Sequence, residues 1–112
     1  MSPRLGFVAI VPAVLLPSVT ALADDAAGTA QAAHTVVIEN MQFNPPQLTV
    51  HRGDRVVWVN KDLFPHTVTS DKVFDSGSIA VDASWSYVAD KTGVFAYSCT
   101  FHPTMKGRIT VQ

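Results

Sequence analysis

The stretch Arg55-Val56-Val57-Trp58-Val59-Asn60 is the strongest indicator of the fold in this chain of 112 residues. Its residue types favour strands, and successive side chains of a strand point to opposite faces of a sheet. Val56, Trp58 and Asn60 then share one face, and the valines between them share the other. Because both faces carry apolar side chains, this strand is expected to lie inside a sandwich of two sheets.

Short runs of the same kind recur on both sides of this stretch, with turn residues between them. Asn44-Pro45-Pro46, Arg52-Gly53-Asp54, Asp75-Ser76-Gly77-Ser78 and Lys91-Thr92-Gly93 are typical turn sequences. Regularly spaced short strands favour an all-β sandwich or barrel over a helical fold. The expected strands are 35–39, 47–51, 55–60, 66–70, 85–88, 93–97 and 107–111, with a shorter one at 73–75 and a helical or irregular segment within 73–83.

Residues 1–23 have the composition of a secretory signal peptide. Arg4 supplies a short positive region, an apolar run follows from 7 to 22, and Ala21-Leu22-Ala23 forms a small-residue cleavage site. The alternative is a membrane anchor, which needs about 20 uninterrupted apolar residues. Pro12 and Pro17 interrupt this run. The sequence therefore predicts export to the periplasm, with cleavage after residue 23 and no stable membrane insertion afterwards.

The expected organisation is a signal peptide at 1–23, a polar lead-in at 24–33 and one domain at 34–112. Loss of Arg4 with the leader leaves seven basic residues against nine acidic ones, a formal charge of −2. No cluster of basic residues is present that would bind nucleic acid or an anionic membrane. Small exported domains often depend on disulfides, but Cys99 is the only cysteine and cannot form one within the chain.

Cys99 begins the segment Cys99-Thr100-Phe101-His102-Pro103-Thr104-Met105, which places a thiolate, an imidazole and a thioether on one short loop between expected strands. His66, at the start of another expected strand, is a further candidate ligand. Two imidazoles, one thiolate and a weak axial thioether are the ligands of a blue-copper electron-transfer site. The spacing therefore predicts one copper ion, cycling between Cu(I) and Cu(II) and held by His66, Cys99, His102 and Met105.

Other interpretations of the same residues are open at this stage. Zinc binds cysteine with two histidines at catalytic sites, although a thioether is a poor fourth ligand for zinc. Cys99 could instead be a buried small apolar residue, or a nucleophile paired with a histidine base. His34 and His51 are interpreted as solvated residues at strand ends, and Met41 as an apolar residue of the core or surface. Phe43, Trp58, Trp85 and Phe95 are interpreted as core residues.

The assembled motifs resemble the cupredoxins, closest to the amicyanin and pseudoazurin branch. The resemblance extends over 36–111 and rests on the ligand loop and on five further motifs, which are Met41-Gln42-Phe43-Asn44-Pro45, Val50-His51-Arg52-Gly53-Asp54, Val57-Trp58-Val59-Asn60, Pro65-His66-Thr67-Val68 and Gly93-Val94-Phe95-Ala96-Tyr97. It implies an eight-strand Greek-key β-sandwich with copper at one end. The two residues between His102 and Met105 match amicyanins, and the same four ligands are implied.

The resemblance also implies how the ligand loops are held and used. The backbone N–H of Thr67 is expected to donate to the Cys99 sulfur. Family members usually carry asparagine at position 67, and its side chain joins the two ligand loops. The edge of His102 is expected to pass electrons through an apolar patch formed by Phe64, Pro65, Phe101 and Pro103. Phe101 departs from amicyanins, which have proline there.

The leading hypothesis is a monomeric periplasmic electron carrier that is not an enzyme. Its expected partners are redox proteins such as a c-type cytochrome and a periplasmic dehydrogenase or reductase. A second hypothesis is a copper-binding protein for copper delivery or tolerance in the cell envelope. A third is a metal-free interaction domain.

Overall fold

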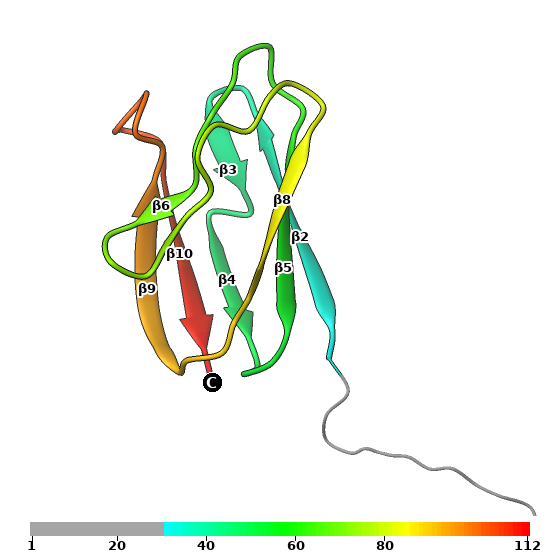
Figure 1. The fold of residues 1–112 in the computed structure, drawn as a ribbon, viewed down its shortest axis with the longest axis vertical. Helices are drawn as coiled ribbons and strands as arrows, with labels where there is room; N and C mark the ends of the chain where they lie inside the picture. Colours follow the sequence, from blue (N-terminus) through cyan, green and yellow to red (C-terminus); the bar gives the residue numbers. More distant parts are fainter. Residues whose placement is uncertain (1–30) are drawn as a thin grey trace, which may run out of the picture.

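Strand β5 (Arg55–Asn60) lies inside a four-stranded sheet, as its two apolar faces predict. The computed structural model describes residues 31–112, in which this sheet packs against a second one of five strands (Figure 1). The first sheet has the order β3-β2-β5-β8 and the second β4-β10-β9-β6-β7. The other strands are β2 (Ala33–Glu39), β3 (Gln42–Asn44), β4 (Gln47–Val50), β6 (Thr69–Ser70), β7 (Phe74–Asp75), β8 (Ser84–Val88), β9 (Gly93–Ser98) and β10 (Lys106–Val111).

Both sheets mix parallel and antiparallel pairs. In the first, β5 runs parallel to β2 and antiparallel to β8, and Trp58 pairs with Val36 on one side and Trp85 on the other. In the second, β10 runs parallel to β4 and antiparallel to β9. The all-β sandwich is therefore confirmed. The expected count of eight strands is wrong, because the described residues form nine.

The strand that the sequence did not predict is β3, and its position explains why. It has only three residues and precedes two prolines, a sequence that predicts a turn. Asn40 and Met41, with φ of 53° and 59°, turn the chain so that β3 pairs with β2. A methionine rarely adopts this left-handed conformation, so the sequence contains no signal for the turn.

The expected strand at 66–70 is shortened to β6, Thr69–Ser70. His66 forms only an isolated bridge with Ile79, and the Thr67 N–H donates to the Cys99 sulfur instead of to a neighbouring strand. Within 73–83 there is no helix, only β7 and irregular backbone. The metal-binding candidates thus lie in loops beyond the strand ends.

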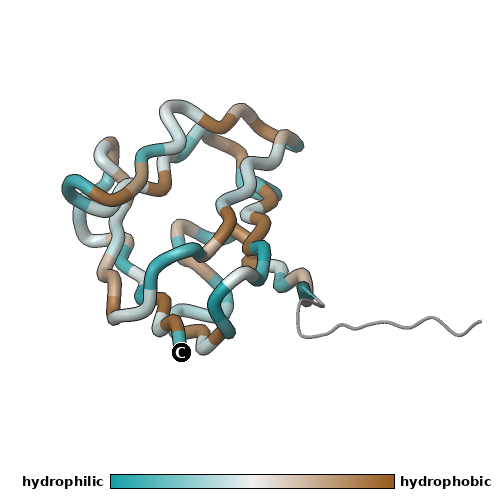
Figure 2. The backbone as a smooth tube through the Cα atoms, turned by 60° about the horizontal axis from the view of Figure 1, so that its bottom comes forward, coloured by the Kyte–Doolittle hydropathy of each residue, from teal (hydrophilic) through white to brown (hydrophobic). Residues whose placement is uncertain are grey.

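The core lies between the sheets and is rich in aromatic residues. Trp58 is fully buried and packs edge-on against Tyr97, with ring centroids 5.4 Å apart. Phe43 is buried as expected, while Trp85 and Phe95 are partly buried against the same cluster. Hydrophobic and hydrophilic residues alternate repeatedly along the backbone (Figure 2).

Gly107 and Tyr97 form a cross-strand pair that leaves no room for another side chain. A Cβ on Gly107 would overlap Cζ and the hydroxyl oxygen of Tyr97. We therefore expect Gly107→Ala to lower the free energy of unfolding by about 1–3 kcal/mol, the usual cost of overpacking a core. Urea unfolding of the metal-free protein measures this effect. Arg108→Ala, at the exposed neighbour on β10, is the control, and equal midpoints for the two variants would contradict the prediction.

Asp54 links separate segments of the chain by hydrogen bonds at the end of β5 opposite Asn60. Its carboxylate accepts hydrogen bonds from the His34 ring at 2.9 Å and from the backbone N–H groups of His51 and Ala32. The bond to His34 is the largest cause, and together these contacts lower the pKa of Asp54 to about 2. His34 is thus a hydrogen-bonded residue of β2 and not a solvated one, whereas His51 is exposed as expected.

This arrangement predicts acid sensitivity. The pKa of Asp54 is lower in the folded than in the unfolded protein, so its stabilising contribution is complete above about pH 4. The contribution is lost as the pH falls from about 4 to about 2. Thermal unfolding of the metal-free protein should therefore show a smaller loss of stability over this range for Asp54→Asn than for wild type. Parallel curves for the two proteins would refute this role of Asp54.

The predicted signal peptide at 1–23 and most of the lead-in at 24–33 lie outside the described residues. The boundaries of these segments therefore stay predictions. In the described part, ordered structure begins with β2 at Ala33, one residue before the expected start of the domain. Within residues 31–112 there is no helix long and apolar enough to cross a membrane.

Candidate metal centre

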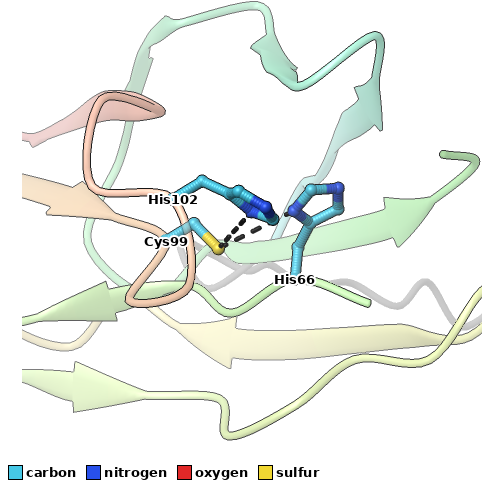
Figure 3. Close-up of side chains that lie close together, drawn as sticks. All are labelled: His66, Cys99 and His102. Atoms are coloured by element: carbon cyan, nitrogen blue, oxygen red, sulfur yellow. Dashed lines mark hydrogen bonds between the residues drawn. The ribbon is translucent and has the colours of Figure 1, made fainter. Parts of the chain in front are cut away.

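His66, Cys99 and His102 come together at the end of the sandwich where their loops meet. The candidate ligand atoms of these three side chains all lie within 4.8 Å of one another. The Cys99 Sγ atom is 3.7 Å from Nδ1 of His66 and 3.8 Å from Nδ1 of His102 (Figure 3). A nitrogen bound at about 2.0–2.1 Å and a sulfur bound at about 2.3 Å to one ion are at most about 4.4 Å apart. The sulfur is therefore close enough to each nitrogen to share a metal ion.

The loop between β9 and β10 carries Cys99, His102 and Met105, and its backbone is closed by hydrogen bonds. The Cys99 N–H donates to the Met105 carbonyl at 3.1 Å, and the Met105 N–H donates to the His102 carbonyl at 2.8 Å. A third bond joins the His102 N–H to the Cys99 carbonyl at 3.2 Å. These bonds fix the loop without a helix, so side chains three residues apart can converge.

The Cys99 sulfur is shielded from solvent and accepts one backbone hydrogen bond. Cys99 is fully buried, and the Thr67 N–H donates to its Sγ atom at 3.3 Å. This contact is the one that the resemblance to cupredoxins implied. A donor aimed at sulfur stabilises negative charge there, and burial protects a thiolate from oxidants. The sulfur is thus suited to bind metal rather than to attack a substrate.

Asp62 determines which nitrogen of His66 is available. Its Oδ2 atom lies 2.8 Å from Nε2 of His66, inside a buried contact. Burial opposes ionisation of Asp62, but hydrogen bonds from the Leu63 N–H, His66 and the Met41 N–H outweigh it, so the pKa of Asp62 is below its ordinary value. An ionised carboxylate only accepts, hence Nε2 carries the proton. Nδ1, which faces the sulfur, then has its lone pair free for a metal.

Asn60 shapes the loop that presents His66. Its side-chain amide donates to the carbonyls of Phe64 at 2.8 Å and Ile79 at 3.0 Å. The Asp62 N–H donates to Asn60 Oδ1 at 2.9 Å. Asn60 is fully buried, so these bonds satisfy a polar group that would otherwise be costly at the end of β5.

Met105 is 3% exposed and closes the ligand loop against the core. A cavity of about 300 Å³ lies beside it and is also lined by Met41 and Phe43. Met41 is partly buried against the core, as expected for an apolar residue of the core or surface. The Met41 N–H donates to Asp62 Oδ2 at 3.0 Å, so the unusual turn before β3 is tied to the carboxylate that orients His66.

These donor atoms fit copper. A buried cysteine sulfur and an imidazole Nδ1 whose other nitrogen is held by a carboxylate are strong ligands for copper. The Met105 thioether, on the same loop as Cys99 and His102, would suit copper better than zinc as a further ligand. His102 is only partly buried and reaches towards the surface. The same set could hold Cu(I) and Cu(II) without large rearrangement, because sulfur favours the former and imidazole serves both.

Comparison with known proteins identifies the family. The family model for the cupredoxin-like domain matches residues 9–111. The chain belongs to the cupredoxin-like family. Amicyanin from Paracoccus denitrificans is 30% identical over 93 residues, covering 78% of this chain and 71% of that protein. Amicyanin from Paracoccus versutus is 31% identical over 83 residues, covering 69% of this chain and 63% of the relative's length.

A solved structure of the Cu(I) form of an amicyanin variant has the same fold. It superposes with a TM-score of 0.69 at 28% identity, covering 76% of this chain and 87% of the other. In a chain of this family, the cluster of His66, Cys99 and His102 is suited to type 1 copper.

The sequence predicted three members of the cluster, but not the residue that orients His66. Asp62 is four positions before His66, in a loop where no periodicity links the two residues. Only the turn in the backbone brings the carboxylate to Nε2. An acidic residue shortly before a ligand histidine was the one available signal, and it has no specific spacing in a loop.

Proposed function

We propose that this cupredoxin is a type 1 copper electron carrier in which His66, Cys99, His102 and Met105 hold a single copper ion. The observation that carries the proposal is the convergence of the Cys99 sulfur with two Nδ1 atoms at 3.7 and 3.8 Å. Copper supplies the one-electron redox chemistry. The chain orients His66 through Asp62, shields the sulfur and places His102 near the surface.

An electron carrier should change little in shape when its charge changes, and the loops around this site favour that behaviour. Backbone bonds close the Cys99–Met105 loop, and Asn60 and Asp62 hold the His66 loop. Hydrogen bonds from neighbouring residues fix the orientation of metal ligands and tune the redox potential of the metal. No catalytic role is proposed, since the described side chains around Cys99 shield it.

Exposed apolar residues on the two ligand loops form a candidate docking patch for redox partners. We define this docking patch as Leu63, Phe64, Pro65, Phe101 and Pro103, all of which are exposed. Leu63 is 81% exposed, and Phe64 and Phe101 are each 52% exposed. Exposed apolar patches of this kind mark interaction sites. The proposed partners are a c-type cytochrome and a periplasmic dehydrogenase or reductase, contacted through His102.

Electron self-exchange between two copies tests the docking patch without a known partner. We expect Phe101→Ser to slow self-exchange about tenfold, the effect of losing an aromatic contact at the centre of an interface. NMR line broadening in mixtures of the Cu(I) and Cu(II) forms measures the rate. Val94→Ser is the control, because Val94 is 61% exposed but lies at the other end of β9. Equal rates in the two variants would rule out this use of the patch.

We propose that the protein acts in the periplasm, because residues 1–23 have the composition of a signal peptide. Expression of the full chain in a Gram-negative host should give periplasmic protein whose first residue is Asp24. Recovery of only the uncleaved chain in the cytoplasm would contradict this.

Copper retention separates the carrier from the copper-delivery protein. The carrier should keep its copper when mixed, in the Cu(I) form, with an apoprotein that accepts Cu(I), because its sulfur is buried and its ligand loop is closed. Competition followed by separation and copper analysis makes the measurement. Rapid transfer of most of the copper would favour delivery over electron transfer.

A further inference from the structure

Three threonines and an aspartate form a continuous chain of hydrogen bonds beside the Cys99 sulfur. The Thr100 N–H donates to Thr67 Oγ1 at 2.8 Å, and the Thr100 hydroxyl is 3.1 Å from the same atom. Thr67 Oγ1 is also 3.1 Å from the Thr69 hydroxyl. The Thr69 hydroxyl donates to Asp75 Oδ1 at 3.2 Å. The chain runs from the buried Thr67 to the exposed Asp75.

Counting hydrogens gives the direction of each bond. A hydroxyl has one hydrogen to donate, and an ionised carboxylate has none. Since Thr69 donates to Asp75, it can only accept from Thr67, which therefore uses its own hydrogen on Thr69. Thr67 Oγ1 then accepts from both the N–H and the hydroxyl of Thr100. Every bond points towards Asp75, so the carboxylate is the terminal acceptor that orders the chain.

Asp75 is itself held in place, and the same turn forms hydrogen bonds with Val68, the residue before Thr69. The Gly77 N–H donates to Asp75 Oδ1 at 2.9 Å. The Val68 N–H donates to Ser76 Oγ at 2.8 Å, and the Ser76 N–H donates back to the Val68 carbonyl at 2.9 Å. The turn after β7 is therefore a fixed support for the stretch 67–69.

We propose that Asp75 is a positioning residue for the metal centre, acting through the hydroxyls of Thr69 and Thr67. Its carboxylate directs the Thr67 hydroxyl outward, which leaves both lone pairs of Thr67 Oγ1 for Thr100. The His66 and Cys99 loops are thereby joined at Thr67. The backbone N–H of this same residue is held on the Cys99 sulfur at 3.3 Å. A surface carboxylate thus controls a hydrogen bond to the ligand sulfur.

Hydrogen exchange in the metal-free protein tests the chain directly. Asp75→Ala and Thr69→Val should each speed exchange of the Thr67 and Thr100 amides roughly three- to tenfold, the effect of weakening one hydrogen bond. Exchange of the Trp58 amide in the core should stay unchanged. Asp75→Asn should restore wild-type rates, because the amide oxygen can accept both bonds. Asp71→Ala is the control, since Asp71 is exposed on the same hairpin and its side chain has no hydrogen bond among the described residues.

The copper form supplies a second reading, which rests on the proposed function. Asp75→Ala and Thr69→Val should shift the thiolate-to-copper absorption band, while Asp75→Asn and Asp71→Ala should not. Unchanged amide exchange in Asp75→Ala, or equal effects in Asp75→Ala and Asp71→Ala, would overturn the proposal. A wild-type protein without a blue band would refute the proposed function instead, and the exchange data would still decide whether the chain exists.

Discussion

Cys99→Ser should abolish the intense blue absorption that Cu(II) gives the wild-type protein. That absorption requires charge transfer from a thiolate to copper, and Cys99 supplies the only thiol in the chain. Serine has nearly the same size, so the buried position should still be filled and the fold retained. Titration of the metal-free protein with Cu(II), followed by visible spectroscopy, measures the loss.

Ser98→Ala is the matched control for this substitution, because Ser98 is the neighbouring residue on β9 and is only partly buried. It should keep the blue band at full intensity. Circular dichroism of both variants shows whether the sandwich is intact. A blue band in Cys99→Ser, with the fold retained, would contradict the assignment of the sulfur as a ligand.

Asp62→Ala should weaken both copper binding and the fold. The substitution leaves Nε2 of the fully buried His66 and the N–H groups of Met41 and Leu63 without their acceptor. Each unsatisfied buried group costs about 1–3 kcal/mol, so a total loss of about 3 kcal/mol in the free energy of unfolding is expected. Loss of the partner that orients a ligand histidine typically lowers metal affinity about 10- to 100-fold.

Two further variants make the test of Asp62 specific. Asp62→Asn keeps an acceptor oxygen and should lose less copper affinity than Asp62→Ala. Asp82→Ala removes an exposed acidic side chain whose contact with Lys61 is 3.5 Å long, so it is the control for copper affinity. It is not a control for stability, because the φ of 68° at Asp82 makes alanine strained there. Copper competition titrations and urea unfolding give the two readings. Equal copper affinity in Asp62→Ala and Asp82→Ala would show that Asp62 does not orient His66.

The sequence predicted the sandwich because β5 has apolar side chains on both faces, a pattern that only burial between layers satisfies. It also indicated the cluster of His66, Cys99 and His102, because a soft-metal ligand set at fixed spacing is unusual. It did not indicate Asp62 or β3. β3 depends on the left-handed turn at Asn40 and Met41. The position of Asp62 depends on loop geometry that has no repeating pattern.

Thr67 is another residue whose role the sequence predicts only in part. The resemblance implied that its N–H would meet the Cys99 sulfur, and the structure confirms that contact. The Thr67 hydroxyl also joins the two loops, but the sequence gives no sign of this. It depends on the positions of Thr69, Thr100 and Asp75, which lie on separate segments. Their alignment is a property of the folded sheet, since β6 pairs with both β7 and β9.

Repeated one-electron cycling of the copper-loaded protein tests the electron-carrier assignment most directly. Stepwise reduction should bleach the blue band with one electron per copper, and reoxidation should restore it fully over many cycles with copper retained. Spectroelectrochemistry with copper analysis before and after cycling makes this measurement. A colourless Cu(II) form, or a band that fails to return because copper leaves on reduction, would contradict the account.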